Sequence, residues 1–178
     1  PAGLALGPHG HTLYVSNQGS NTVTLIDTRT RKVRATFPAG ASPTALAVSP
    51  DGRTLYVTDT LAHQVLPIRI ASGQTGKPFA TGLSPRALAL SPNGKRLYVA
   101  NTAVDTLSVI HTASGAEGTP IAVGPGPIGV VFSRDGHEAY AIDSQSGRCA
   151  LIQTASGHVL ASVPVAPFLM ALSSPVAP

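Results

Sequence analysis

Oxygen-bearing side chains recur along this sequence at a spacing of 42 residues, in a pattern that could bind a ligand. They are Asn17, Asp59, Asn101 and Asp143, with Asp105 shortly after the third. Carboxylate and carbonyl oxygens are the ligands that a hard cation such as calcium prefers, and a ring of such groups could also hold a polyhydroxylated molecule. Asn and Asp are also common turn formers, because their side chains hydrogen-bond the backbone two residues on. Turn formation is the main interpretation of these five residues, and ligand binding is the functional alternative.

The remaining chemically active residues add one arginine to this set. Arg86 is the one cation among the residues expected to start the inner strands, and it is therefore a candidate ligand contact. The six histidines do not fall in the spacing of a zinc site, and no motif places a Ser, His and Asp together. Cys149 aligns with Val23, Val65 and Leu107, which predicts a small buried hydrophobe. The sequence therefore predicts no catalytic residue, no metal site and no cofactor.

The elements that would position these residues follow the same repeat. Tyr14, Tyr56, Tyr98 and Tyr140 recur every 42 residues, each shortly after a turn that contains glycine. Short runs rich in Val, Ile, Leu, Tyr and Thr alternate with clusters of Gly, Pro, Asn, Asp and Ser, as in strands joined by tight turns. A repeat of this length built from strands is typical of a propeller blade. We therefore predict an all-β fold, a β-propeller of four four-stranded blades at about residues 1–42, 43–84, 85–126 and 127–166.

Within the first unit, the pattern predicts strands at residues 3–6, 12–16, 22–26 and 33–37. Asp-Gly and Asn-Gly between the first two strands of the later units provide the positive φ angles of a tight hairpin. The first unit has His9-Gly10 there, which is a weaker version of the same signal.

The third unit carries a further resemblance. Tyr98-Val99-Ala100-Asn101, preceded by Ser91-Pro92-Asn93-Gly94-Lys95-Arg96-Leu97, resembles the consensus of the bacterial β-propellers built from YVTN repeats. The resemblance covers essentially the whole chain. It implies a propeller fold, and it implies little about the task, because the consensus residues are those that build the blades. The sequence lacks tryptophan, which argues against the WD-repeat class.

Charge and composition restrict the partners. The net charge is +4, and the basic residues are expected mainly on the face that carries the hairpin turns. This face lacks interleaved aromatic residues that could stack bases, so nucleic acid is not a predicted partner. No apolar run approaches the roughly 20 residues of a membrane-spanning helix. Charged residues make up only 11% of the chain, which favours an extracytoplasmic location, whether secreted, periplasmic or at the cell surface.

The C-terminal residues 167–178 repeat the start of a blade for a fifth time. The chain is therefore expected to be a small closed ring, a piece of a larger ring or half of an assembly. In the last two cases the end blades would present apolar faces and unpaired strand edges, which predicts self-association. Two copies could then close as a ring of eight blades.

These observations predict a non-catalytic binding or scaffolding module. It would contact a protein or a small polar ligand through its loop faces or its blade edges. Lactone hydrolases and some dehydrogenase subunits have related propellers. The alternative function is therefore a lactonase-like hydrolase or a redox-enzyme component, with a site at the mouth of the central channel.

Overall fold

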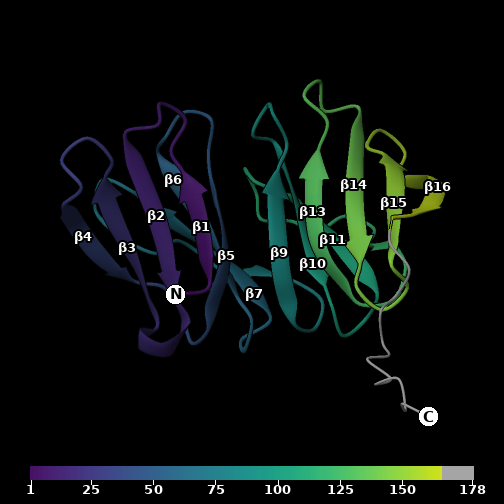
Figure 1. The fold of residues 1–178 in the computed structure, drawn as a ribbon, viewed down its shortest axis with the longest axis horizontal. Coiled ribbons are helices and arrows are strands. Elements are labelled where there is room, and N and C mark those ends of the chain that lie inside the picture. The colour runs from purple at the N-terminus through teal and green to yellow at the C-terminus, as the bar shows by residue number, and fades with distance from the viewer. Residues whose placement is uncertain (166–178) are drawn as a thin grey trace, which may run out of the picture.

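The computed structural model describes residues 1–165, which form four antiparallel sheets of four strands each (Figure 1). Blade 1 comprises β1 (Gly3–Leu6), β2 (Thr12–Asn17), β3 (Thr22–Asp27) and β4 (Val33–Pro38), with a short 3-10 turn η1 (Gln18–Ser20). Blade 2 comprises β5 (Pro43–Val48), β6 (Thr54–Asp59), β7 (Gln64–Arg69) and β8 (Phe79–Ala80). Blade 3 comprises β9 (Pro85–Leu90), β10 (Arg96–Asn101), β11 (Thr106–His111) and β12 (Ile121–Ala122). Blade 4 comprises β13 (Pro127–Phe132), β14 (Glu138–Asp143), β15 (Arg148–Gln153) and β16 (His158–Pro164). The predicted strands of the first unit agree with β1–β4 to within one residue, and the predicted fifth inner strand at 167–178 lies outside the described residues.

The first hairpin of each blade is encoded by its own turn residues. Gly52, at φ +69°, supplies the positive φ angle of the second blade, and its counterparts in the other blades do the same. In blade 2 the Ser49 hydroxyl donates to Asp51 Oδ1 at 2.5 Å, and that oxygen also accepts the Arg53 N–H at 3.0 Å. The same bonds recur around Asn93 and Asp135. Blade 1 has Gly7 and His9 at these positions, so its hairpin lacks the side-chain bonds.

Each blade has two different apolar faces. The tyrosine face carries the repeat tyrosine, and the aliphatic face carries the repeat Leu or Ala immediately before it, as in Leu55 and Tyr56 of blade 2. In every interface within the described chain, the tyrosine face of one blade packs on the aliphatic face of the next. The Tyr98 and Phe132 rings, for example, pack across the boundary between blades 3 and 4 with their centroids 4.7 Å apart. The core therefore consists of three successive layers between blades.

The inner strands contact one another in chain order, β1 with β5, β5 with β9 and β9 with β13. Blades 1 and 4 lie at opposite ends of the resulting fan (Figure 1). The aliphatic face of blade 1 and the tyrosine face of blade 4 are therefore uncovered within residues 1–165, and several of their large apolar side chains are exposed. Among these residues, no helix is long and apolar enough to cross a membrane.

The expected burial of Cys149 was wrong. Its counterparts Val23, Val65 and Leu107 are fully buried, whereas Cys149 is partly exposed. The reason is its position on the tyrosine face of blade 4, which no further blade of the described chain covers.

Candidate functional site

A cavity of about 430 Å³ opens where the inner strands begin, on the face that carries the loops between blades. It is built by the first three blades, since it lies at the starts of β1, β5 and β9. Its side chains are small or polar, and Arg86 is the one charged residue among the described residues that line it. The lining residues are Ala2, Gly3, Gln18, Thr44, Ala45, Thr60 and Arg86.

The threonine hydroxyls in this cavity are held in place by hydrogen bonds. The Thr44 hydroxyl lies 2.7 Å from that of Thr58 and 2.8 Å from that of Thr60. Thr60 in turn donates to the Pro85 carbonyl at 2.8 Å, which connects blade 2 to the start of β9. Gln18 donates through Nε2 to the Ser42 hydroxyl at 2.9 Å. The site therefore presents oriented polar groups next to one exposed cation, an arrangement suited to a small ligand that carries both negative charge and oxygen atoms.

Of the six predicted site residues, the structure brings only Arg86 into this cavity. The other five lie at or beyond the ends of the second strands, and the side chains of four of them form hydrogen bonds in the loops or strands of their own neighbourhood. Asp59 accepts the backbone N–H groups of Ala41 and Ser42 at 3.0 and 3.1 Å. Asn17 donates to Thr24 at 2.9 Å, Asn101 donates to Ser108 at 3.0 Å, and Asp105 accepts the Gly126 N–H at 2.9 Å. A ligand role for Asn17, Asp59, Asn101, Asp105 and Asp143 remains a prediction.

Gln18, Thr44 and Thr60 were not among the predicted site residues. A signal for two of them is present in the sequence, because each repeat has a polar residue directly after its second strand. These residues are Gln18, Thr60, Thr102 and Ser144. The Thr102 hydroxyl also donates to the Pro127 carbonyl, at the start of the next inner strand, at 2.8 Å. The position therefore connects neighbouring blades as well as lining the cavity.

Asp143 differs from its counterpart Asp59 although both are 1% exposed. Neither oxygen of the Asp143 carboxylate has a hydrogen-bond partner within the described chain. The donor that Ala41 provides to Asp59 is absent, since Pro125 occupies the corresponding position and has no N–H. The Gly126 N–H is used by Asp105, and the Arg148 guanidinium turns to Ser162. Asp59 also accepts from Gln64 Nε2 at 3.3 Å, and Arg148 occupies the position of Gln64. Three of the four groups that donate to Asp59 have thus been replaced or redirected at Asp143; the fourth is the Ala62 N–H, whose bond to Asp59 is long at 3.4 Å.

This environment raises the pKa of the Asp143 carboxyl, chiefly through burial. The negative charge of Asp105 raises the pKa further. The nearby Gly124 N–H and the positive charge of Arg148 act in the opposite direction, although neither makes a hydrogen bond to the carboxylate. The ionised form of Asp143 is therefore a source of instability in the folded protein.

Replacing Asp143 by asparagine is expected to increase the free energy of unfolding at pH 7. In the unfolded chain an aspartate titrates near about pH 3.9. Because the pKa of Asp143 is raised in the folded protein, this group does not reduce the free energy of unfolding below about pH 3.9. The reduction develops as the pH rises above the unfolded pKa and through the folded pKa. The gain from Asp143→Asn should therefore disappear at about pH 3.5, as measured by urea unfolding at both pH values. Asp59→Asn is the matched control, and should lose about 1–3 kcal/mol at pH 7 because Asp59 accepts backbone bonds. A less stable Asp143→Asn protein at pH 7 would contradict this interpretation.

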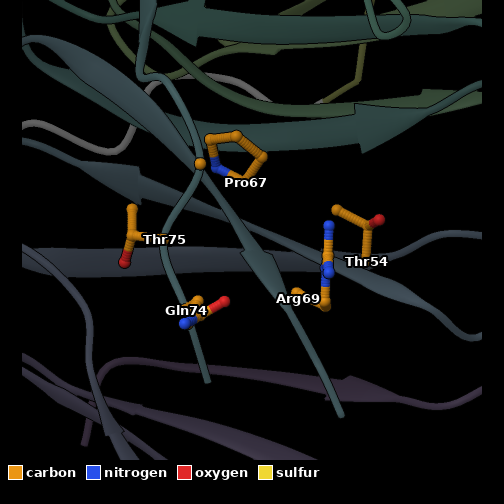
Figure 2. A pocket seen from close by; sticks show the side chains of 6 residues that line it. Thr54, Pro67, Arg69, Gln74 and Thr75 are labelled. Carbon is orange, nitrogen blue, oxygen red and sulfur yellow. The ribbon is translucent and has the colours of Figure 1, made fainter. Parts of the chain in front are cut away.

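A second hollow lies on blade 2, next to the loop that connects β7 and β8. It has a volume of about 250 Å³, and Figure 2 shows the Arg69 side chain beside that of Thr54, its cross-strand partner. An adjoining cavity of about 590 Å³ shares these two residues and adds Arg53 and Asp51. Together the two cavities combine both signs of charge, and no aromatic side chain is among the described residues that line them. Neither feature points to a nucleic-acid surface.

Comparison with known proteins identifies the architecture. A model of the YNCE-like beta-propeller family matches residues 2–88. The structure of Kuenenia stuttgartiensis hydrazine synthase is similar over 91% of this chain and 48% of its own, with a TM-score of 0.86 and 32% identity. A functionally unknown protein from Desulfotomaculum acetoxidans DSM 771 is similar over 90% of this chain and 55% of its own, with a TM-score of 0.77 and 18% identity. No curated protein sequence matches the chain.

The predicted fold is confirmed, since the chain is an all-β propeller domain with four four-stranded blades within residues 1–165. It spans about half the length of the two solved chains that it resembles.

Proposed function

We propose that this chain is a binding module that takes a small anionic ligand bearing several oxygen atoms at the cavity beside Arg86. The observation that carries the proposal is the composition of that cavity. One exposed guanidinium stands beside hydroxyl groups whose positions are set by hydrogen bonds. The described lining residues include no acid, histidine or cysteine, so the cavity itself is equipped for recognition and not for proton transfer or nucleophilic attack.

Membership of the YVTN-repeat propellers is part of this proposal. It is supported by the Tyr98-Val99-Ala100-Asn101 phrase and by the match of a related propeller family over residues 2–88. An extracytoplasmic location is also proposed, on the low charged fraction of 11%.

The test is a thermal-shift titration with inorganic phosphate, small dicarboxylates and sugar acids, each assayed separately. A ligand present at 100 times its Kd stabilises the folded state by about 2.7 kcal/mol. For a chain of this size that corresponds to a rise in melting temperature of about 5–10 °C. Arg86→Ala should abolish the rise while leaving the melting temperature without ligand close to that of the wild type, because Arg86 is exposed.

Arg134→Ala is the matched control, since Arg134 is an exposed arginine in a hairpin turn of blade 4, outside the cavity lining. It should retain the full response. An equal loss in both variants would indicate a general effect of charge, and a response that survives Arg86→Ala would refute the site.

A second candidate function is that of a component of a redox enzyme or a hydrolase. The similarity to a hydrazine synthase at 32% identity supports it, although the match covers 48% of that chain. This alternative predicts a rise in melting temperature with a divalent cation that disappears in Asp143→Ala and Asp59→Ala, each compared with and without the cation. The anion-binding proposal predicts no such dependence.

A further inference from the structure

Two hollows adjoin one another along the boundary between blades 3 and 4, on the face that carries the hairpin turns. The inner hollow has a volume of about 350 Å³ and lies between the β9–β10 turn and the β13–β14 turn. The outer hollow, of about 190 Å³, lies between the outer part of blade 3 and the β15–β16 turn of blade 4. Arg96 and Thr154 line both hollows, so the two form one groove, the Arg96 groove, which crosses blade 3 from its inner turn toward its outer strand.

Arg96 lies in the middle of this groove and is held there by a hydrogen bond across the blade boundary. Its Nη1 donates to the Thr154 carbonyl at 2.5 Å. A guanidinium has five N–H groups, so this contact orients the side chain and leaves donors for an anion. The other blades have no cation at this repeat position, where they carry Thr12, Thr54 and Glu138.

The other basic groups of the groove lie on both sides of Arg96. Lys95 and His137 line the inner hollow, and His111, the cross-strand partner of Arg96, lines the outer one. Asp135 is the one acidic residue among the described residues that line the groove, and its carboxylate accepts two hydrogen bonds within its own turn. The basic groups are therefore distributed along the groove, and its single carboxylate is already engaged.

The turn that borders the inner hollow lacks a negative charge that blades 2 and 4 carry. Asn93 Oδ1 accepts from the Ser91 hydroxyl at 2.8 Å and from the Lys95 N–H at 3.0 Å. Asp51 and Asp135 accept the same two bonds at the same repeat position. The turn therefore forms with either residue type, and asparagine in blade 3 leaves the positive charge of Lys95 without a neighbouring carboxylate in that turn.

We propose that the Arg96 groove binds an extended acidic segment of a partner protein, whose carboxylates lie along it against Lys95, Arg96 and His111. Charge complementarity favours this partner, since clusters of basic side chains recognise acidic motifs. Single-stranded nucleic acid is less suited to the groove. Tyr98 is 1% exposed and its ring packs on Phe132 in the core layer between the blades, so the Tyr98 ring is not available to stack on a base.

The distribution of the basic groups favours a segment with several carboxylates over a small anion. One exposed ion pair strengthens binding only about two- to fivefold. Several such pairs on one chain act together, because the first contact raises the effective concentration of the next carboxylate. The groove therefore does not depend on the proposed ligand cavity beside Arg86, which lies on the opposite face and takes a small anion.

The test measures the binding of a labelled hexaglutamate peptide to the 178-residue chain by fluorescence anisotropy at low ionic strength, where exposed charges are least screened. Lys95→Gln and Asn93→Asp should each raise the Kd about two- to fivefold. Lys95 is exposed, and Asn93→Asp keeps turn bonds that blades 2 and 4 form with aspartate, so both variants should keep the wild-type melting temperature. Arg96 itself is left unchanged, because its replacement would also remove the bond to Thr154.

Arg53→Gln and Gln74→Glu are the matched controls on blade 2. Arg53 is exposed at the repeat position of Lys95, and Gln74 is an exposed amide in the β7–β8 loop. Each control changes the net charge as the corresponding test variant does, but outside the lining of the groove, so each should leave the Kd unchanged. Equal losses in test and control variants would assign the binding to net charge and overturn the groove.

The Nε resonances of the arginine side chains separate this groove from the cavity beside Arg86. In a proton–nitrogen correlation spectrum, hexaglutamate should shift the Arg96 resonance and leave that of Arg86 in place. Arg86→Ala should bind the peptide with the wild-type Kd, so either site can fail without changing the result for the other.

Three results would overturn the proposal: no binding of hexaglutamate, an Arg96 resonance that does not move, or equal affinity for a neutral hexaglutamine peptide. Equal affinity for hexathymidylate would overturn the assignment to an acidic protein segment.

Discussion

Replacing Tyr98 by alanine is expected to lower the free energy of unfolding by about 3–5 kcal/mol, as for other large aromatic side chains in a core. Tyr98 is 1% exposed and fills the layer between blades 3 and 4, where its ring packs on Phe132. Its neighbours across this layer include the small residues Ala139 and Ala141, which cannot expand into the vacated space. Urea unfolding at a single protein concentration measures the loss.

Tyr98→Phe is the control for this prediction, because it keeps the ring and removes only the hydroxyl. Burial raises the pKa of the Tyr98 hydroxyl, which is therefore neutral at pH 7. We expect the buried ring, packed on Phe132, to account for most of the stabilisation. The loss for Tyr98→Phe should be about 1 kcal/mol or less. Equal losses in the two variants would show that the hydroxyl, and not the packing of the ring, stabilises this layer.

Replacing Gly40 by alanine is expected to lower the free energy of unfolding by about 2–5 kcal/mol. Gly40 has a φ of +88°, which is unfavourable for any residue with a Cβ. A Cβ at this position would also lie 2.3 Å from Asp59 Oδ2 and 2.8 Å from Leu66 Cδ1. The Asp59 carboxylate would have to move away from the Ala41 and Ser42 N–H groups, which would then lose their acceptor.

Gly52→Ala separates the two contributions. Gly52 has a similar φ of +69°, but the nearest atom to an added Cβ is Pro8 Cγ at 3.5 Å, an ordinary contact. Gly52→Ala should therefore lower the free energy of unfolding only by the backbone contribution of about 1–2 kcal/mol. If Gly40→Ala lowers the free energy of unfolding no more than Gly52→Ala does, the stability of the protein does not depend on the observed position of the Asp59 carboxylate.

Much of the fold could be predicted from the sequence because its signals are local. The turn at Asp51-Gly52 is specified by the glycine and by the Asp51 carboxylate, which accepts from the Ser49 hydroxyl and the Arg53 N–H, each two residues away. The hairpin therefore does not depend on the rest of the chain. Alternation of buried and exposed residues then determines which face of a strand packs inward. The regular recurrence of Tyr98 and its counterparts extends this reasoning from one blade to four.

The candidate site was only partly predictable. Arg86 could be identified because it is the one cation at the start of an inner strand. Thr44 occupies the same repeat position without a charge, and Gln18 and Thr60 lie in turns that meet it only when the blades are assembled. Asp59 and Asp143 are equivalent in sequence, yet one is fully hydrogen-bonded and the other is not. Part of that difference comes from Pro125, which lies 18 residues before Asp143 in the chain and reaches it only through the loop between blades.

The sequence alone determined the number of described blades, their strands and their hairpin turns, since each of these depends on residues a few positions apart. Tertiary structure decided which polar groups share a cavity, which carboxylate is left without a donor and which residues of one repeat position are exposed. The physical reason is that burial and hydrogen bonding depend on the neighbouring blade. Leu4 and Leu46 have the same side chain at the same repeat position, and within residues 1–165 only Leu46 has a tyrosine face packed against it.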